Sequence, residues 1–236
     1  MATHLITGAG SGIGEALTEA LLARGDEAWL VARDAGRARQ LAERFGSAGG
    51  TVRTVVGDLA EPERLSWALG HQALPGELDS LLHVAGIVEL GAVGELTAKT
   101  WQATLAANLV APAELTRLLL PQLRQGRGQI VFVNSGAGLS AAPRWSAYAA
   151  SKHGLKALAD SLRAEEAEHG VRVTSVYPGR TATPMQLKVH QQEGRSYDPQ
   201  QWVPAEAVAR TVLTALDMPR GTEVSDLRIR PGGRGR

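Results

Sequence analysis

Residues 7–14 read Thr7-Gly8-Ala9-Gly10-Ser11-Gly12-Ile13-Gly14. This glycine-rich stretch follows a short apolar run at 4–7 and leads directly into a helical pattern at 14–24. Glycines in a strand-to-helix turn tolerate positive φ, and the helix N-terminus offers free N–H groups and a partial positive charge. The stretch therefore predicts a phosphate-binding turn. Its spacing is not that of the G-x-G-x-x-G pattern, because Ile13 stands where the third glycine would be, and taken alone it also fits a simple tight turn.

The remainder of the chain repeats this order of strand followed by helix. Short apolar runs of β-type occur at 4–7, 27–32, 51–56, 80–84, 129–134, 172–177 and 224–229. Helical patterns fill the gaps at 14–24, 35–45, 62–71, 97–125, 147–169 and 204–216. Such alternation is typical of βαβ units and a parallel sheet. Since no linker-like break interrupts it, we predict one doubly wound, Rossmann-type α/β domain over 1–236 with a seven-stranded, mostly parallel sheet.

Composition and charge exclude several classes of protein. The 25 Lys and Arg residues nearly balance the 24 Asp and Glu residues, and a net charge of +1 gives no reason to expect a nucleic acid or a membrane as partner. The chain has no cysteine and its six histidines lack a metal-ligand spacing, so we expect neither disulfides nor a metal. Without a span-length apolar stretch or a signal-peptide pattern, it is expected to be soluble and cytoplasmic.

Two segments fall outside the alternating pattern. Residues 180–203 have weak periodicity and lie between a strand and a helix, at the edge of the sheet where α/β proteins bind ligands. Long connections in such places are often functional, so we predict a substrate lid. The Arg/Gly-rich end at 230–236 is predicted to be a flexible tail without a function, because chain termini are commonly poorly ordered.

A tyrosine and a lysine stand four residues apart in a strong helical pattern. Tyr148 and Lys152 therefore fall on one face of the 147–169 helix. A phenol titrates near pH 10, and an ammonium about 4 Å away would favour the phenolate by up to about 4 kcal/mol. The pair predicts a tyrosine that transfers protons near neutral pH. An exposed helix that carries both residues by coincidence fits the five-residue pattern at least as well.

Ser135 directly follows the 129–134 strand. A hydroxyl at the carboxyl end of a central strand points into the ligand crevice of an open α/β sheet. The loop between Ser135 and Tyr148 is long enough to fold the next helix back over that crevice. Taken alone, the serine is more readily explained as a turn residue or a helix cap.

Together these motifs resemble the classical short-chain dehydrogenase/reductase (SDR) family. The resemblance covers the chain up to residue 229 and rests on residues that match in order and spacing: Thr7, Gly8, Gly12, Ile13, Gly14, Asp58, Ala85, Gly86, Asn108, Ser135, Tyr148, Lys152, Pro178 and Gly179. Each motif is weak by itself, whereas chance agreement of all of them is very improbable. One departure is His83-Val84 before Ala85-Gly86, where the family usually has two asparagines; this puts the usual asparagine contacts in doubt, and His83 reads better as structural.

The resemblance implies that four residues are catalytic. Tyr148 would protonate a carbonyl oxygen in reduction or take the proton of an alcohol in oxidation. Lys152 would lower the pKa of Tyr148 and hold the ribose hydroxyls, and Ser135 would hydrogen-bond the reacting oxygen. Asn108, a polar residue in an otherwise apolar helical run, would hold a water that links Lys152 to solvent.

The resemblance also implies the contacts with a nicotinamide dinucleotide. Besides Tyr148 and Lys152, the expected residues lie in the glycine-rich turn and after the following strands: Gly8, Ser11, Gly12, Ile13, Gly14, Arg33, Asp58, Leu59, Ala85, Gly86, Pro178, Gly179, Thr181 and Thr183. Asp58 would bind the adenine amino group, and Thr183 the nicotinamide carboxamide or the phosphate region. Thr181 stands where the family commonly has Val or Ile.

Residues 32–34 bear on the choice of dinucleotide. An acidic residue at the end of the second strand binds the ribose 2′-OH of NAD, whereas a nearby arginine accommodates the 2′-phosphate of NADP. Here the neutral Ala32 is followed by Arg33. Asp34 is the competing signal, but it reads better as the N-cap of the next helix. We therefore predict NADP(H), with NAD(H) as the lesser alternative.

The predicted function is hydride transfer between NADP(H) and the carbonyl/alcohol pair of a small or medium, largely apolar substrate. The pocket would be lined by 136–145, 88–90 and the lid, with few charges apart from Glu89 and Arg144. Reduction of 3-oxoacyl thioesters, oxidation of 3-hydroxy acids and general carbonyl reduction all stay open. The alternatives are a catalytically silent dinucleotide-binding regulator and an NAD(H)-preferring alcohol dehydrogenase. By resemblance, we also expect a homodimer or homotetramer formed through the helices that carry Asn108 and Tyr148.

Overall fold

A seven-stranded sheet forms the centre of the computed structural model, which describes residues 1–232. Its order is β3-β2-β1-β4-β5-β6-β9, and all neighbouring strands are parallel. The strands are β1 (Thr3–Thr7), β2 (Glu27–Ala32), β3 (Thr51–Val56), β4 (Ser80–His83), β5 (Gln129–Val133), β6 (Arg172–Pro178) and β9 (Asp226–Ile229). The chain winds outward from β1 in one direction and from β4 in the other, so the predicted doubly wound α/β fold is confirmed.

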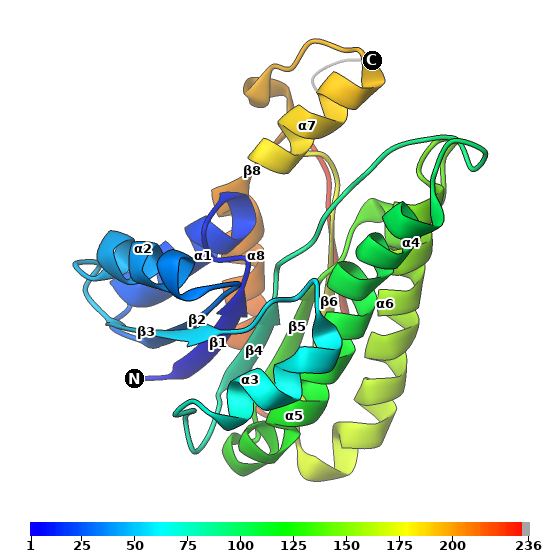
Figure 1. Cartoon of the computed structure of the whole chain (residues 1–236). Coiled ribbons are helices and arrows are strands. Elements are labelled where there is room, and N and C mark those ends of the chain that lie inside the picture. Colours follow the sequence, from blue (N-terminus) through cyan, green and yellow to red (C-terminus); the bar gives the residue numbers. More distant parts are fainter. Residues whose placement is uncertain (233–236) are drawn as a thin grey trace.

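Helices cover both faces of the sheet (Figure 1). One face carries α1 (Gly12–Ala23), α2 (Ala35–Phe45) and α8 (Ala205–Leu216). The other carries α3 (Leu65–Gly70), α5 (Ala111–Gly126) and α6 (Ser146–Glu166), with α4 (Ala98–Leu105) beside α6. Two helical layers on one sheet explain why the central strands carry consecutive apolar residues, such as Leu81-Leu82 on β4 and 130–133 on β5.

The core consists of two apolar clusters, one on each side of the sheet. Successive residues of a strand point to opposite faces, and so Leu81 packs under α5 and α6 while Leu82 packs under α1 and α8. On β5, Phe132 joins the first side and Val131 the second. All four side chains are fully buried.

The segment predicted as one helix over 97–125 contains a π-helical turn. Residues Ala106–Val110 form this turn between α4 and α5, and the N–H of Ala111 donates to the carbonyl of Ala106, five residues back. Pattern analysis detects helical character but not this wider winding. At the start of the helix predicted over 35–45, Asp34 caps α2 as expected. Its side chain accepts a 2.7 Å hydrogen bond from the Arg37 N–H.

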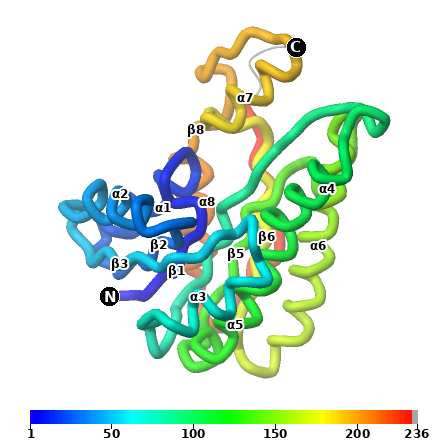
Figure 2. Tube along the Cα trace, viewed as in Figure 1, coloured from blue at the N-terminus to red at the C-terminus, as the bar shows by residue number. Residues whose placement is uncertain are grey.

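Residues 180–203 hold regular structure that the sequence pattern did not reveal. They form β7 (Thr181–Ala182), α7 (Pro184–Glu193), a 3₁₀ turn (Pro199–Gln201) and, with residue 204, β8 (Val203–Pro204). Helix α7 lies beyond the carboxyl edge of the sheet, apart from the two helical layers (Figure 2). Its buried residues are Gln186, Val189 and His190, two of them polar, which explains the weak hydrophobic periodicity. Of the predicted tail, 230–232 have no regular structure, and 233–236 lie outside the described residues.

Candidate active site

The glycine-rich turn and the turn after β4 meet at the carboxyl edge of the sheet. Gly8 adopts φ +74°, and a Cβ there would lie 2.8 Å from the backbone of Ala85. A Cβ on Gly14 would lie 2.1 Å from the carbonyl oxygen of Gly8. The Thr7 hydroxyl ties the two turns together by accepting from the N–H groups of Val84 and Ala85 at 3.0 and 3.1 Å. Gly8 and Gly14 are therefore required by close packing at the point where the strand order reverses.

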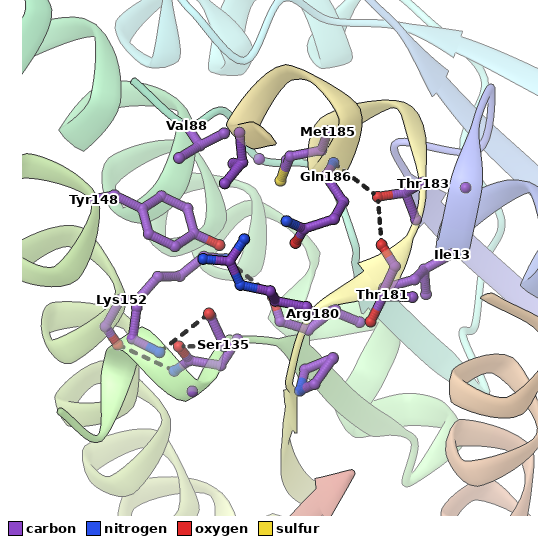
Figure 3. Close-up of a pocket in the computed structure, with 18 of the residues that line it drawn as sticks. Ile13, Val88, Ser135, Tyr148, Lys152, Arg180, Thr181, Thr183, Met185 and Gln186 are labelled. Carbon is purple, nitrogen blue, oxygen red and sulfur yellow. Dashed lines mark hydrogen bonds between the residues drawn. The ribbon is translucent and has the colours of Figure 1, made fainter. Parts of the chain in front are cut away.

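A cavity of about 530 Å³ opens between this turn, α6 and α7 (Figure 3). It is lined by most of the predicted site residues: Gly8, Ser11, Gly12, Ile13, Gly14, Ala85, Gly86, Ser135, Tyr148, Lys152, Pro178, Gly179, Thr181 and Thr183. A hollow that also borders on Gly8, Ser11 and Ala85 is lined by the remaining predicted cofactor contacts Arg33, Asp58 and Leu59. The structure thus brings together every predicted residue except Asn108, which lies behind the cavity wall.

Ser135 stands in the loop that leaves β5, and its position is fixed by Asn134. The buried Asn134 side chain accepts a 2.9 Å hydrogen bond from the Ser135 N–H and donates a 3.1 Å bond to the Lys152 carbonyl. It therefore fastens the serine loop to α6. Sequence analysis missed this residue, although a polar side chain at the end of a buried strand is itself a signal.

Tyr148 and Lys152 lie one turn apart on α6, and both are buried. The Lys152 ammonium donates a 3.0 Å hydrogen bond to the Val133 carbonyl and lies 5.9 Å from the Tyr148 ring centroid. Burial raises the pKa of the Tyr148 phenol, and a hydrogen bond with Ser135 acts in the opposite direction. Burial lowers the pKa of Lys152 to about 8. The predicted lowering of the Tyr148 pKa by Lys152 is not seen in this structure, in which burial has the largest effect on the phenol.

Asn108 lies in the π-helical turn and uses its side chain to join three segments. Its Oδ1 accepts from the Ile87 N–H at 2.8 Å, while its Nδ2 donates to the Ile87 carbonyl at 2.9 Å and to the Ser151 hydroxyl at 3.0 Å. Ser151 in turn donates to the Tyr148 carbonyl at 2.7 Å. Both amide N–H groups of Asn108 are thus engaged, so the side chain has no N–H left to donate to a water.

His83 is buried on β4 and belongs to the packing of the sheet. Its Nε2 lies 2.9 Å from the Thr116 hydroxyl, and its ring stacks on Phe132 at 4.9 Å between centroids. Burial and the charge of Lys152 lower the pKa of His83 to about 3, so the ring is neutral. This geometry agrees with the structural role expected for His83.

The hollow beside β2 carries two arginines. Arg33 is exposed, and its Nε donates to Asp34 at 3.3 Å. Arg37, from the first turn of α2, donates to the Gly10 carbonyl at 3.3 Å and lines the same hollow. Sequence analysis named only Arg33, although the place of Arg37 in the first turn of the helix predicted directly after Asp34 was an available signal.

The outer wall of the cavity differs from the predicted one in its charges. Val88 lines it as expected, together with Met185 and Val189 from α7. Glu89 and Arg144 do not line the cavity, and the charge on this wall belongs to Arg180, which sequence analysis overlooked. The signal for Arg180 was its place directly after Pro178-Gly179.

A glycine-rich turn at the switch point of a doubly wound parallel sheet defines a Rossmann-type protein. The sequence profile described as short chain dehydrogenase matches residues 2–194, and the chain therefore belongs to the short-chain dehydrogenase/reductase family of oxidoreductases. This confirms the family resemblance.

Known relatives are similar to this chain over most of its length. Dehydrogenase/reductase SDR family member 7B of Bos taurus is 32% identical over 229 residues, which cover 91% of this chain and 70% of the bovine one. An oxidoreductase of the same family from Burkholderia thailandensis has a TM-score of 0.83 at 31% identity, over 98% of this chain and 92% of that chain. A metagenomic short-chain oxidoreductase in complex with NADP has a TM-score of 0.81 at 28% identity, over 99% and 98% of the two chains.

The described part of the chain lacks both a membrane-spanning helix and a metal-binding cluster. Within residues 1–232, no helix combines the length and the apolar character needed to cross a bilayer. The same residues contain no group of three or more His, Cys, Asp or Glu side chains arranged to hold a metal ion.

Proposed function

We propose that this protein is an NADP(H)-dependent oxidoreductase that interconverts a carbonyl compound and a secondary alcohol. The observation that carries the proposal is the meeting of Ser135, Tyr148 and Lys152 in one cavity, whose other wall is the glycine-rich turn (Figure 3). Structural neighbours in complex with NADP, and one from Sphingobium yanoikuyae with NADPH, support the choice of cofactor.

The residues at the edge of the sheet fit a dinucleotide. A side chain at Gly8 or Gly14 would fill the space beside the turn, and the N-terminus of α1 presents free N–H groups toward it. Asp58 and Arg33 border the adjoining hollow, where the first would hold the adenine and the second a 2′-phosphate. When bound, NADPH supplies the hydride, which is chemistry that no side chain of this chain can provide.

The chain's own residues would orient the substrate oxygen and move its proton. Because burial raises the pKa of Tyr148, the phenol is protonated at neutral pH and can give its proton to the carbonyl oxygen. Ser135 would hydrogen-bond the same oxygen. Lys152, with a pKa of about 8, is mostly cationic at pH 7 and would stabilise the negative charge left on Tyr148. In oxidation the roles of Tyr148 reverse.

Residues 180–203 would act as a lid over the substrate. Helix α7 is fastened to the segment after β4 by Lys188, whose ammonium lies 2.7 Å from a Glu89 carboxylate oxygen and 3.1 Å from the Val88 carbonyl. Gln192 on the same helix accepts from the Leu90 N–H at 3.1 Å. These contacts support a closed position in which water is excluded from the reacting groups.

We also propose self-association through the helices that carry Asn108 and Tyr148. On α4, α5 and the turn between them, Trp101 and Leu118 are only half-buried and Val110 is exposed, whereas Leu115 and Leu119 are accounted for by the core. Light scattering at micromolar concentration is expected to show a dimer or a tetramer, and a monomer would contradict the proposal.

The function is tested by following NADPH and NADH absorbance with a panel of ketones, aldehydes and 3-oxo esters. We expect turnover with NADPH that is lost in Tyr148→Phe, a variant that keeps the ring and removes the hydroxyl. Tight NADPH binding without turnover on any compound would favour a catalytically silent regulator. Faster turnover with NADH than with NADPH would indicate an NAD(H)-preferring alcohol dehydrogenase.

A further inference from the structure

Arg180 places a second positive charge in the wall of the cavity. Lys152 and Arg180 are the two charged side chains among the lining residues in the described part of the chain, and no acidic side chain lines it. The proposed chemistry uses Lys152 but gives Arg180 no task. The Arg180 side chain is 28% exposed, and it brings a charge to a wall that Val88, Met185 and Val189 make apolar.

The guanidinium of Arg180 is held in place by the lid, from outside the cavity. Its two terminal nitrogens donate to the two carboxylate oxygens of Glu193 at 2.8 and 2.6 Å. Its centre lies 5.5 Å from the ring centroid of Trp202. A guanidinium fixed by a bidentate ion pair and an aromatic ring loses little further entropy when it binds a ligand.

These contacts leave part of the guanidinium without a partner. Arginine has five N–H donors, and Glu193 takes one from each terminal nitrogen. No hydrogen bond within residues 1–232 uses the Nε–H or the second N–H of Nη2 of Arg180, and its Nε is not among the buried polar atoms that lack a partner. The Nε/Nη2 edge is the second fork of a guanidinium and matches a carboxylate in a bidentate geometry.

We propose that Arg180 binds a carboxylate of the substrate, and that the preferred substrates are oxo acids and the corresponding hydroxy acids. This deepens the proposed function by naming its substrate class, and it rests on that function. In Figure 3 the Arg180 side chain extends into the same cavity as Tyr148 and Ser135. The substrate carboxylate would therefore bind at Arg180 while the oxo group faces the tyrosine.

The rest of the cavity defines the body of such a substrate. Val88, Trp145 and Val189 offer apolar contact beside Tyr148. Met185 adds a flexible apolar side chain from the lid. These side chains favour an unbranched or lightly branched hydrocarbon chain between or beside the two polar ends.

A purely structural role for Arg180 predicts a different outcome. If the arginine only fastened α7 through Glu193, then loss of either partner would affect all substrates alike. If it binds the substrate carboxylate, then loss of Arg180 affects acids alone, and loss of the Glu193 charge spares the preference for acids. A comparison of substitutions at Arg180 with substitutions at Glu193 therefore separates the two roles.

The test compares 2-, 3- and 4-oxo acids of six carbons with their methyl esters, using NADPH. The variants are Arg180→Met, Arg180→Lys and Glu193→Gln, with Arg64→Met as a control that removes an arginine from an exposed ion pair with Glu61 on the surface. For at least one position of the oxo group, wild type is expected to prefer the acid. Arg180→Met should lower the acid-to-ester ratio of kcat/KM at least 10-fold, Arg180→Lys should restore part of it, and Glu193→Gln and Arg64→Met should keep it.

Equal losses for acid and ester in Arg180→Met and Glu193→Gln would overturn the proposal. So would turnover of esters and ketones by wild type without any preference for an acid, and this result would leave the proposed function intact. Failure of wild type to reduce any compound would count against the proposed function instead. Calorimetric titration of the oxo acids into the NADP⁺-saturated protein would then still test Arg180, because weaker binding by Arg180→Met supports the carboxylate site and equal binding overturns it.

Discussion

In the layered body of the molecule, side chains such as Leu82 and Phe132 are fully buried between a sheet and two helical layers. In the lid over 180–203, ion pairs contribute to the packing: Arg180 pairs with Glu193, and α7 reaches Glu89 through Lys188. Burial of apolar surface stabilises the body by far more than partly exposed ion pairs stabilise the lid. We therefore propose that the body fixes the reacting groups, while the lid opens and selects the substrate.

The largest effect that we expect in the body concerns pH. His83 has a pKa of about 3 in the folded state and an ordinary value of 6.5 in the unfolded state. Below pH 6.5 the unfolded chain takes up a proton that the folded chain does not, so stability is lost as the pH falls from 6.5 toward 3, by up to about 4 kcal/mol. Urea unfolding of wild type at several pH values should show this loss. In His83→Asn, the free energy of unfolding should depend less on pH.

The exposed His71 provides the matched control for this measurement. His71→Asn is expected to keep the pH dependence of wild type. An identical pH dependence in His83→Asn and wild type would show that His83 does not titrate as its burial requires.

Cavity-forming substitutions compare the two regions directly. Leu82→Ala in the body should lower the free energy of unfolding by about 3 kcal/mol, as expected for a fully buried leucine. Val189→Ala in the lid removes part of a buried side chain too, but we expect the lid to open locally before the body unfolds, so the global value should fall by less than about 1 kcal/mol. Urea titrations followed by circular dichroism would measure both values. Equal losses would show that lid and body unfold as one unit.

Arg33, directly after β2, belongs to the body, and its charge should affect only the binding of the cofactor. Arg33→Ala removes the proposed partner of the 2′-phosphate and is expected to weaken NADPH binding about 10-fold, as for a lost charge-assisted contact. Binding of NADH, which lacks that phosphate, should change less than about 2-fold. Fluorescence titration with both cofactors measures the difference. Equal weakening of the two would contradict the assignment of Arg33.

The smallest effect is expected at the attachment of the lid. Glu89→Gln keeps the size of the side chain but removes the charge that faces Lys188, a contact worth about 1 kcal/mol or less at a partly exposed site. We expect a rise in KM of about 2- to 5-fold, the amount by which a population shift of that size reduces binding. The free energy of unfolding should stay unchanged. Glu114→Gln, which breaks an ion pair with Arg117 on α5, is the control and should alter neither quantity.

The body was predictable because its strands and helices carry strong periodic patterns. Each predicted strand of the sheet is present within two residues of its predicted ends, and Asp34 caps α2 as its sequence position indicated. Burial of both faces of the sheet under helices requires apolar residues at regular positions, and these positions can be recognised in the sequence. In the candidate site, the same regularity allowed Ser135, Tyr148 and Lys152 to be placed at one edge of the sheet.

The lid was not predictable in the same way. Helix α7 buries Gln186 and His190 beside Val189, so its contacts are specific polar ones that leave no periodic trace. Arg180 and Glu193 lie thirteen residues apart, and only the folded path of the chain shows that they pair. The position of the Lys152 ammonium likewise depends on its hydrogen bond to the Val133 carbonyl, which the spacing of four residues does not reveal.

The π-helical turn at 106–110 determines where the length of this helical run can vary. The turn contains one residue more than regular α-helical winding would use. Deleting one residue from it would therefore give regular winding and keep α5 in its present orientation. Deleting one residue from the regular winding of α5, such as Ala113, would instead rotate the rest of that helix by about 100°. Leu115, Leu119 and Leu123 would then point away from the sheet that they now cover.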